Sequence, residues 1–75
     1  MEKTKIRLQE VNQVKEFVRE ASRCNFDIDI SYNRVVVDAK SLLGVLSLDL
    51  TKELSVTCRG YNPNFENILK KFAVS

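Results

Sequence analysis

The side chains in this chain that could take part in chemistry are few, and histidine is not among them. Without an imidazole, no ordinary base near neutral pH is available to activate a serine or a cysteine. The two cysteines, Cys24 and Cys58, do not form a Cys-x-x-Cys pair, so the sequence predicts no zinc site, no other metal and no cofactor. Both thiols lie in apolar patterns and are interpreted as small buried side chains. At Cys58, an inward position on a strand would raise the thiol pKa.

Asp27 and Asp29 have the spacing of a carboxylate pair on one face of a strand. Such a pair serves as general acid and base only where the surroundings raise one pKa above the other. These two residues alternate with Ile28 and Ile30, which puts them on the polar face, and no neighbouring residue would separate their pKa values. We interpret them as solvated sheet surface, and the sequence indicates no enzyme.

Ser41 is a candidate for modification, because it stands immediately before an apolar run and predicts a helix N-cap. A phosphate there would meet free backbone N–H groups and the positive end of the helix dipole, and Lys40 would add a cation. The cap alone is worth about 1 kcal/mol and is sufficient to account for the residue. A cap alone is therefore the favoured interpretation, and a cap that is also a phosphorylation site is the alternative.

The run after Ser41 carries more apolar surface than one core requires. At about 100° per residue, Leu42, Leu43, Leu46 and Leu50 fall on one arc, and Val45 and Leu48 fall on another. A surface helix needs an apolar stripe of roughly 100°, and this run has about twice that. The excess predicts either deep burial or a docking surface for another protein, and we favour the docking surface.

The elements that must position these residues follow from hydrophobic periodicity. Alternation of apolar and polar residues predicts strands, and Asn33-Arg34 between two of them predicts a tight hairpin turn. Recurrence at three and four residues predicts helices, with Asn12, Ser41 and Asn62 as N-caps. The predicted strands are residues 5–9, 26–33, 35–39 and 54–59, and the predicted helices are about residues 12–24, 42–50 and 63–73.

In chain order these elements make β-α-β-β-α-β-α, within a single domain of residues 1–75. A hairpin and helical crossovers in so short a chain favour an antiparallel sheet with its helices on one face. The sequence thus predicts an α+β fold, with a four-stranded antiparallel sheet and three helices on one face.

The charge balance limits the classes of partner. Twelve basic and ten acidic residues leave a net charge of +2, which is too even for nucleic acid or an anionic membrane surface. The polar face of the predicted sheet has no aromatic residues on which bases could stack. No apolar run approaches the ~20 residues of a membrane-spanning helix, and no signal-peptide pattern follows the first residues. The sequence predicts a cytoplasmic protein.

Residues 40–48, Lys-Ser-Leu-Leu-Gly-Val-Leu-Ser-Leu, are similar to the segment around the regulatory serine of HPr, the small phosphocarrier of the bacterial sugar phosphotransferase system. The resemblance extends from Phe17 to about Leu69, and it includes Phe17-Val18, Val37-x-Ala39-Lys40-Ser41 and Arg59-Gly60. It implies the HPr fold, an open-faced βαββαβα sandwich in which the first and fourth strands are adjacent.

The resemblance also implies a lost phosphotransfer site. In HPr a histidine between the first strand and the first helix carries the phosphoryl group, and an arginine two residues later assists it. Counting back without gaps from Phe17-Val18 puts Glu10 at the histidine position and Asn12 at the arginine position, in a loop several residues shorter than the family's. Glu10 could mimic a phosphorylated histidine; we favour simple complementarity to the helix dipole, worth ~0.3–1 kcal/mol.

Two further family features match this chain. Ser41 corresponds to the serine that a dedicated kinase phosphorylates, and Leu42, Leu43 and Leu46 correspond to the apolar docking patch. A branch of the family that lacks the histidine and keeps the serine acts in catabolite repression. The hypothesis is therefore a non-catalytic, degenerate HPr-like docking or regulatory protein, whose partners are phosphotransferase-system enzymes, an HPr kinase or a transcription regulator. The alternative is a structural or protein-interaction module with no role in that system.

Overall fold

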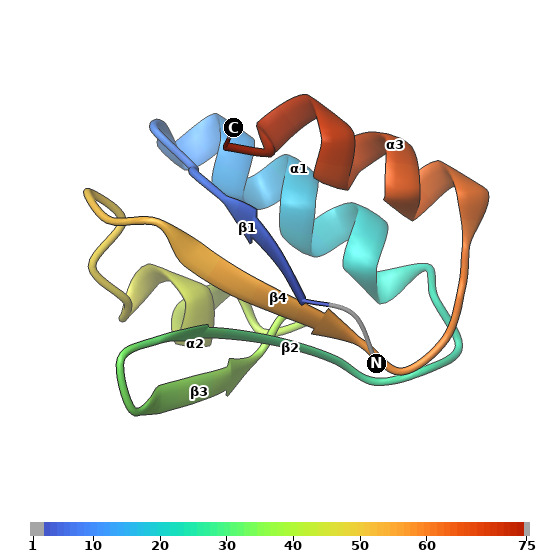
Figure 1. The fold of residues 1–75 in the computed structure, drawn as a ribbon, viewed down its shortest axis with the longest axis horizontal. Helices are drawn as coiled ribbons and strands as arrows, with labels where there is room; N and C mark the ends of the chain where they lie inside the picture. Colours follow the sequence, from blue (N-terminus) through green and yellow to red (C-terminus); the bar gives the residue numbers. More distant parts are fainter. Residues whose placement is uncertain (1–2, 75) are drawn as a thin grey trace.

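The structure, a computed structural model, describes residues 3–74 of the chain (Figure 1). Its elements are β1 (Lys3–Ile6), α1 (Val11–Ser22), β2 (Ile28–Tyr32), β3 (Val35–Asp38), α2 (Leu42–Leu46), β4 (Leu54–Cys58) and α3 (Pro63–Phe72).

The strands form one antiparallel sheet in the order β1-β4-β2-β3. In Figure 1 the strands cross the front of the molecule, and α1 and α2 lie behind them. The α+β prediction is confirmed, including the antiparallel sheet, the helices on one face and the pairing of the first strand with the fourth.

The core lies between the helices and the covered face of the sheet. The rings of Phe17 in α1 and Phe65 in α3 are 5.6 Å apart between centroids, which joins these two helices at the centre. Every second side chain of a strand points into this core, because successive strand side chains face opposite sides of the sheet. The fully buried side chains from the strands are Ile6, Ile28, Ile30, Leu54 and Val56.

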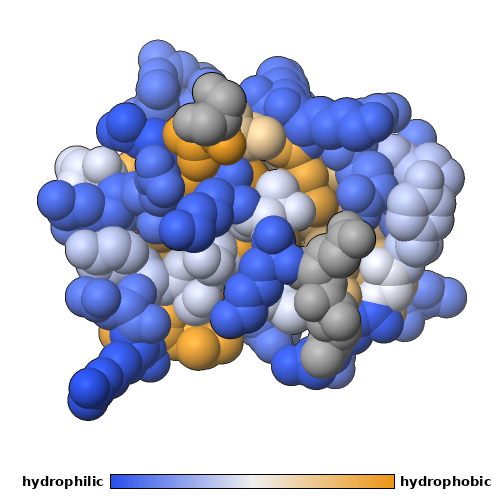
Figure 2. Space-filling view, viewed as in Figure 1, coloured by the Kyte–Doolittle hydropathy of each residue, from blue (hydrophilic) through white to orange (hydrophobic). Residues whose placement is uncertain are grey.

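The opposite face of the sheet is open and polar. Figure 2 shows mostly hydrophilic side chains on this side, with a small hydrophobic patch at the lower edge over β3. Asp29 and Arg59 form an ion pair there, with 3.1 Å between Oδ2 and Nη2. Asp27 is exposed, so both aspartates belong to solvated sheet surface as expected.

The hairpin between β2 and β3 turns at Asn33 and Arg34, as predicted. Asn33 has a φ of 56° and is the only non-glycine residue with a positive φ among residues 3–74. Asparagine tolerates this left-handed region because its short polar side chain can bond locally.

The start of α1 differs from the prediction. Glu10, and not Asn12, is the N-cap residue, and the Glu10 carbonyl accepts the N–H groups of Gln13 and Val14 at 3.0 and 3.1 Å. The Gln13 side chain reaches back and accepts the N–H of Gln9 at 2.7 Å. Asn12 lies inside the first turn of α1, so the prediction of Asn12 as the N-cap was wrong.

The central helix, α2, is shorter than the predicted residues 42–50. The Ser47 hydroxyl donates to the Gly44 carbonyl at 2.6 Å, which competes with continued helical hydrogen bonding. Asp49 then accepts from the N–H and the hydroxyl of Thr51, at 3.1 and 2.5 Å, and makes a turn. Leu48 therefore reaches the core from a turn that follows the helix.

The last helix begins as the sequence predicted. The Asn62 side chain accepts the N–H groups of Asn64 and Phe65 at 2.9 and 3.1 Å, and Pro63 occupies the first helical position. After α3 the chain returns beside β1, where Ile6 and Ala73 form a bridge.

Candidate functional site

Ser41 caps α2, as predicted. Its backbone is extended, with φ −102° and ψ 109°, and its Oγ accepts the N–H of Gly44 at 3.1 Å. The residue is exposed, so a modifying enzyme could reach the hydroxyl. A β-carbon on Gly44 would lie 3.2 Å from the Ser41 Oγ and 3.3 Å from Val37 Cβ, so glycine lets α2 pack closely against β3.

Lys40 has a partner that the sequence did not suggest. Its Nζ donates to the Cys24 carbonyl at 3.0 Å, just beyond the end of α1. A cation there complements the negative end of the α1 dipole. The ammonium is therefore engaged with the end of α1 instead of standing free beside Ser41.

The leucines of α2 divide between the core and the surface. Val45 is fully buried and Leu48 is 7% exposed, so this arc faces the core as expected. Leu43 is 82% exposed and Leu46 is 38% exposed. Leu42 is half-buried and packs against the core, so the exposed apolar surface of α2 consists mainly of Leu43 and Leu46.

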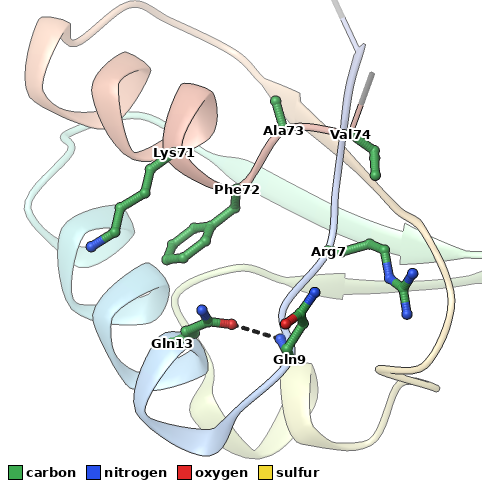
Figure 3. A pocket seen from close by; sticks show the side chains of 7 residues that line it. All are labelled: Arg7, Gln9, Gln13, Lys71, Phe72, Ala73 and Val74. Carbon is green, nitrogen blue, oxygen red and sulfur yellow. Dashed lines mark hydrogen bonds between the residues drawn. The ribbon is translucent and has the colours of Figure 1, made fainter.

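Glu10 and Asn12 are the residues that we predicted at the family's phosphotransfer positions. In the structure Glu10 ends the connection between β1 and α1, and Asn12 lies in the first turn of α1. Glu10 and Asn12 are both exposed, and the Glu10 side chain makes no capping hydrogen bond. A pocket of about 290 Å³ lies nearby, between this connection and the end of α3 (Figure 3). Neither Glu10 nor Asn12 lines it; its lining residues are Arg7, Gln9, Gln13, Lys71, Phe72, Ala73 and Val74.

The two cations of this pocket already have partners. Arg7 Nη2 donates to the Thr51 carbonyl at 3.2 Å, and Lys71 Nζ contacts both carboxylate oxygens of Glu16 at 3.0 and 3.1 Å. The Gln9 backbone and the Gln13 amide are bonded to each other. Sequence reasoning missed this pocket because its walls come from the two ends of the chain.

The bond from Arg7 to Thr51 has a second consequence, because Thr51 follows α2. It brings the connection before α1 against the connection after α2. The region that contains Glu10 and the region that contains α2 are therefore neighbours in the fold.

The two cysteines are free thiols with raised pKa values. Cys24 is buried, and its burial is the main cause of the raised pKa. Burial also raises the pKa of Cys58 to about 11, and the negative charge of Glu66 acts in the same direction. The expected direction at Cys58 is confirmed, and neither thiol has the lowered pKa of a nucleophile.

Metal-ligand clusters and membrane-spanning helices are both absent from residues 3–74. In this part of the chain no three His, Cys, Asp or Glu residues lie together as metal ligands would. None of the helices described is long and apolar enough to cross a membrane.

Comparison with known proteins gives the following matches. A family model described as "PTS HPr component phosphorylation site" matches residues 10–73. No curated protein matches the chain significantly. The crystal structure of HPr-C-His from Thermoanaerobacter tengcongensis is similar with a TM-score of 0.77 at 20% identity, over 95% of this chain and 89% of that chain. The phosphocarrier protein HPr from Bacillus anthracis str. Ames has a TM-score of 0.66 at 26% identity, over 93% of this chain and 87% of that chain.

Proposed function

The chain belongs to the HPr family of the phosphotransferase system, and from this premise we propose that it is a docking member of the family that carries no phosphohistidine. Its partners are enzymes of that system or a kinase or transcription regulator that recognises HPr. The proposal includes a cytoplasmic location, which two free thiols support.

The absence of histidine from the sequence supports the loss of phosphohistidine transfer. A neutral imidazole nitrogen accepts the phosphoryl group in the family, and this chain has Glu10 and Asn12 at the expected positions. Glu10 instead contributes a negative charge at the positive end of the α1 dipole.

The observation that carries the docking role is the 82% exposure of Leu43. A leucine with so little contact contributes almost nothing to the core, whereas Val45, two residues later, is fully buried. With Leu46 beside it, Leu43 offers apolar surface next to the exposed Ser41. Contiguous exposed apolar surface of this kind is typical of sites where another protein binds.

Replacing Leu43 with lysine tests the docking role. We expect Leu43→Lys to weaken binding to the first phosphotransfer enzyme by at least about tenfold, or about 1.4 kcal/mol, as measured by titration calorimetry. Tyr61→Lys is the matched control, because Tyr61 is 72% exposed and precedes α3. Equal binding by both variants would show that α2 is not the contact surface, and no binding by the wild type would contradict docking to this enzyme.

Phosphoryl transfer is tested with the same enzyme and phosphoenolpyruvate. We expect no acid-labile phosphate on the protein, because no imidazole is present. Mass spectrometry checks this, since one phosphoryl group adds about 80 Da. An acid-labile gain of that mass would show that another residue has replaced the histidine.

Phosphorylation of Ser41 is the regulatory part of the proposal. Its support is the exposed hydroxyl at the start of α2 and the family match around it. An HPr kinase is expected to phosphorylate the wild type and not Ser41→Ala. Phosphate on neither protein, or on another residue of both, would contradict regulation through Ser41. The docking role would then still be tested by Leu43→Lys.

A further inference from the structure

The two edges of the sheet differ in whether another backbone segment lies beside them. At the β1 edge, the N–H of Val74 donates to the Lys5 carbonyl at 3.0 Å, and the N–H of Arg7 donates to the Phe72 carbonyl at 3.0 Å. The returning C-terminal segment thus covers the end of β1, at Lys5 and Ile6. At the other edge, β3 has β2 on one side and, among residues 3–74, no strand on its outer side.

The direction of the β3 backbone groups follows from the ladder. The N–H of Ala39 donates to the Ile28 carbonyl at 2.9 Å, so residue 39 faces β2. Residues alternate along an antiparallel strand between those that bond to the neighbour and those that face away. The backbone N–H and C=O groups of Val35 and Val37 therefore also face β2, while those of Val36 and the N–H of Asp38 face outward.

The first three side chains of β3 have no charge and include no proline, the features that commonly protect an edge strand. Lysine, proline or a bulge commonly prevents edge strands from pairing with other chains. This strand instead reads Val-Val-Val-Asp, and Val35 and Val36 are 52% and 62% exposed. Figure 2 shows a hydrophobic patch over this strand.

We propose that β3 pairs antiparallel with β3 of a second copy of this chain, about a two-fold axis at Val36. In this register Val36 lies opposite its own counterpart, and Arg34 of each copy lies opposite Asp38 of the other. Opposite charges then meet at both ends of a central apolar contact, and cross-strand pairs of this kind stabilise a sheet. This charge complementarity favours a second copy over an unrelated extended peptide.

The backbone groups permit this pairing at the centre of the strand. Val36 can exchange N–H···O=C hydrogen bonds with its counterpart, because both its groups face outward. The Asp38 carbonyl already accepts the N–H of Ser41 at 3.0 Å, so the outer pairs rely on the Asp38 N–H. The interface is small, and we expect a weak dimer that does not involve Leu43 or the proposed docking role.

Sedimentation equilibrium tests the pairing, with protein from about 10 µM to about 1 mM, the range expected for a small interface. The wild type is expected to form dimers, and Val36→Lys is expected to weaken association by at least about tenfold, because two ammonium groups would meet at the axis. Hydrogen exchange at the Val36 amide is expected to slow as the wild-type concentration rises.

Charge exchange tests the register. Arg34→Asp and Asp38→Arg each place like charges together in a homodimer, so each variant alone should associate more weakly than the wild type. An equimolar mixture restores both opposite-charge pairs and should associate better than either variant. Because the Asp38 carboxylate also accepts the N–H of Lys40 at 2.9 Å, melting curves must show that Asp38→Arg folds. If it does not fold, Val36→Lys and the Val36 amide decide the matter.

Three results would contradict the proposed dimer, each in a different way. A wild-type protein that stays monomeric at about 1 mM overturns the proposal, as it leaves β3 free for another partner. Dimers that survive Val36→Lys and disappear with Leu43→Lys overturn it too, because they form through α2. A mixture that associates no better than its components overturns the antiparallel register.

Discussion

At Gly60 the chain passes very close to the ring of Phe26. A β-carbon built on Gly60 would lie 2.6 Å from the Cγ and Cδ1 atoms of that ring and 3.1 Å from its Cβ. These atoms are near the Phe26 backbone, so the ring cannot move away without a larger shift. Glycine is required here because a β-carbon does not fit. The backbone conformation does not require it, since Gly60 has no positive φ.

We expect Gly60→Ala to lower the free energy of unfolding by about 1–3 kcal/mol, the usual effect of an overpacked site. Gly44→Ala is the comparison: its β-carbon would meet Ser41 and Val37 at 3.2–3.3 Å, a milder overlap than at Gly60, and the helix propensity of alanine offsets it by up to about 1 kcal/mol. Urea denaturation of both variants measures the difference. Equal losses would indicate that Phe26 adjusts easily.

The thiol of Cys58 makes stability depend on pH in the alkaline range. Its pKa is about 11 in the folded protein, against an ordinary value of 9.0. Between these values the unfolded chain loses the proton first, so the free energy of unfolding falls as pH rises. We expect this decline to be shallower in Cys58→Ala, as measured by urea denaturation at several pH values. Parallel declines would show that other groups are responsible.

At the scale of elements, the stability of α2 comes from its cap and its packing, because the helix is short. It has only five helical residues, and an isolated helix of that size would not persist in water. Packing of Val45 and the Ser41 hydrogen bond hold it in place.

Substitutions at Ser41 measure this cap. We expect Ser41→Ala to cost ~1 kcal/mol and Ser41→Asp to retain most of the stability, because aspartate caps about as well as serine. Ser47→Ala is the control at the other end of the helix, where the hydroxyl bonds the Gly44 carbonyl. Thermal melts compare the three variants, and a neutral Ser41→Ala would mean that packing alone holds α2.

Burial also separates two leucines of this region. Leu48→Ala is expected to leave a core cavity and cost ~2–5 kcal/mol. Leu46→Lys is expected to cost far less, because Leu46 is 38% exposed and the lysine stem can lie along apolar surface. Thermal melts of the two variants test this, and equal destabilisation would show that α2 is buried on both faces.

At the scale of the whole molecule, the two ends of the described chain support each other. The segment after α3 lies along β1, and Lys71 pairs with Glu16 of α1 at 3.0 Å. This surface ion pair contributes little, since exposed pairs are worth about 0–1 kcal/mol. The backbone bonds of the C-terminal segment therefore matter more to this edge.

Val74→Pro removes the N–H that donates to the Lys5 carbonyl. The preceding Ala73 is already extended, at φ −61° and ψ 143°, so proline is compatible with the chain before it. We expect a loss of about 1 kcal/mol relative to Val74→Ala, which keeps the N–H. Urea denaturation measures the loss, and equal stability of the two variants would show that the bond does not hold the segment.

The sequence by itself determined the order of the elements, the inward faces of β1, β2 and β4, the hairpin at Asn33 and the caps at Ser41 and Asn62. Each of these follows from interactions between residues close in the chain, which periodicity and capping patterns report. The same patterns separated Val45 and Leu48, which are buried, from Leu43 and Leu46.

Tertiary structure alone decided the remaining features. Lys40 bonds the Cys24 carbonyl, Gly60 meets the Phe26 ring, and the C-terminal segment covers β1 while β3 stays uncovered within residues 3–74. These contacts depend on how elements pack and how each chain segment is directed, and a local pattern of residue types does not encode either.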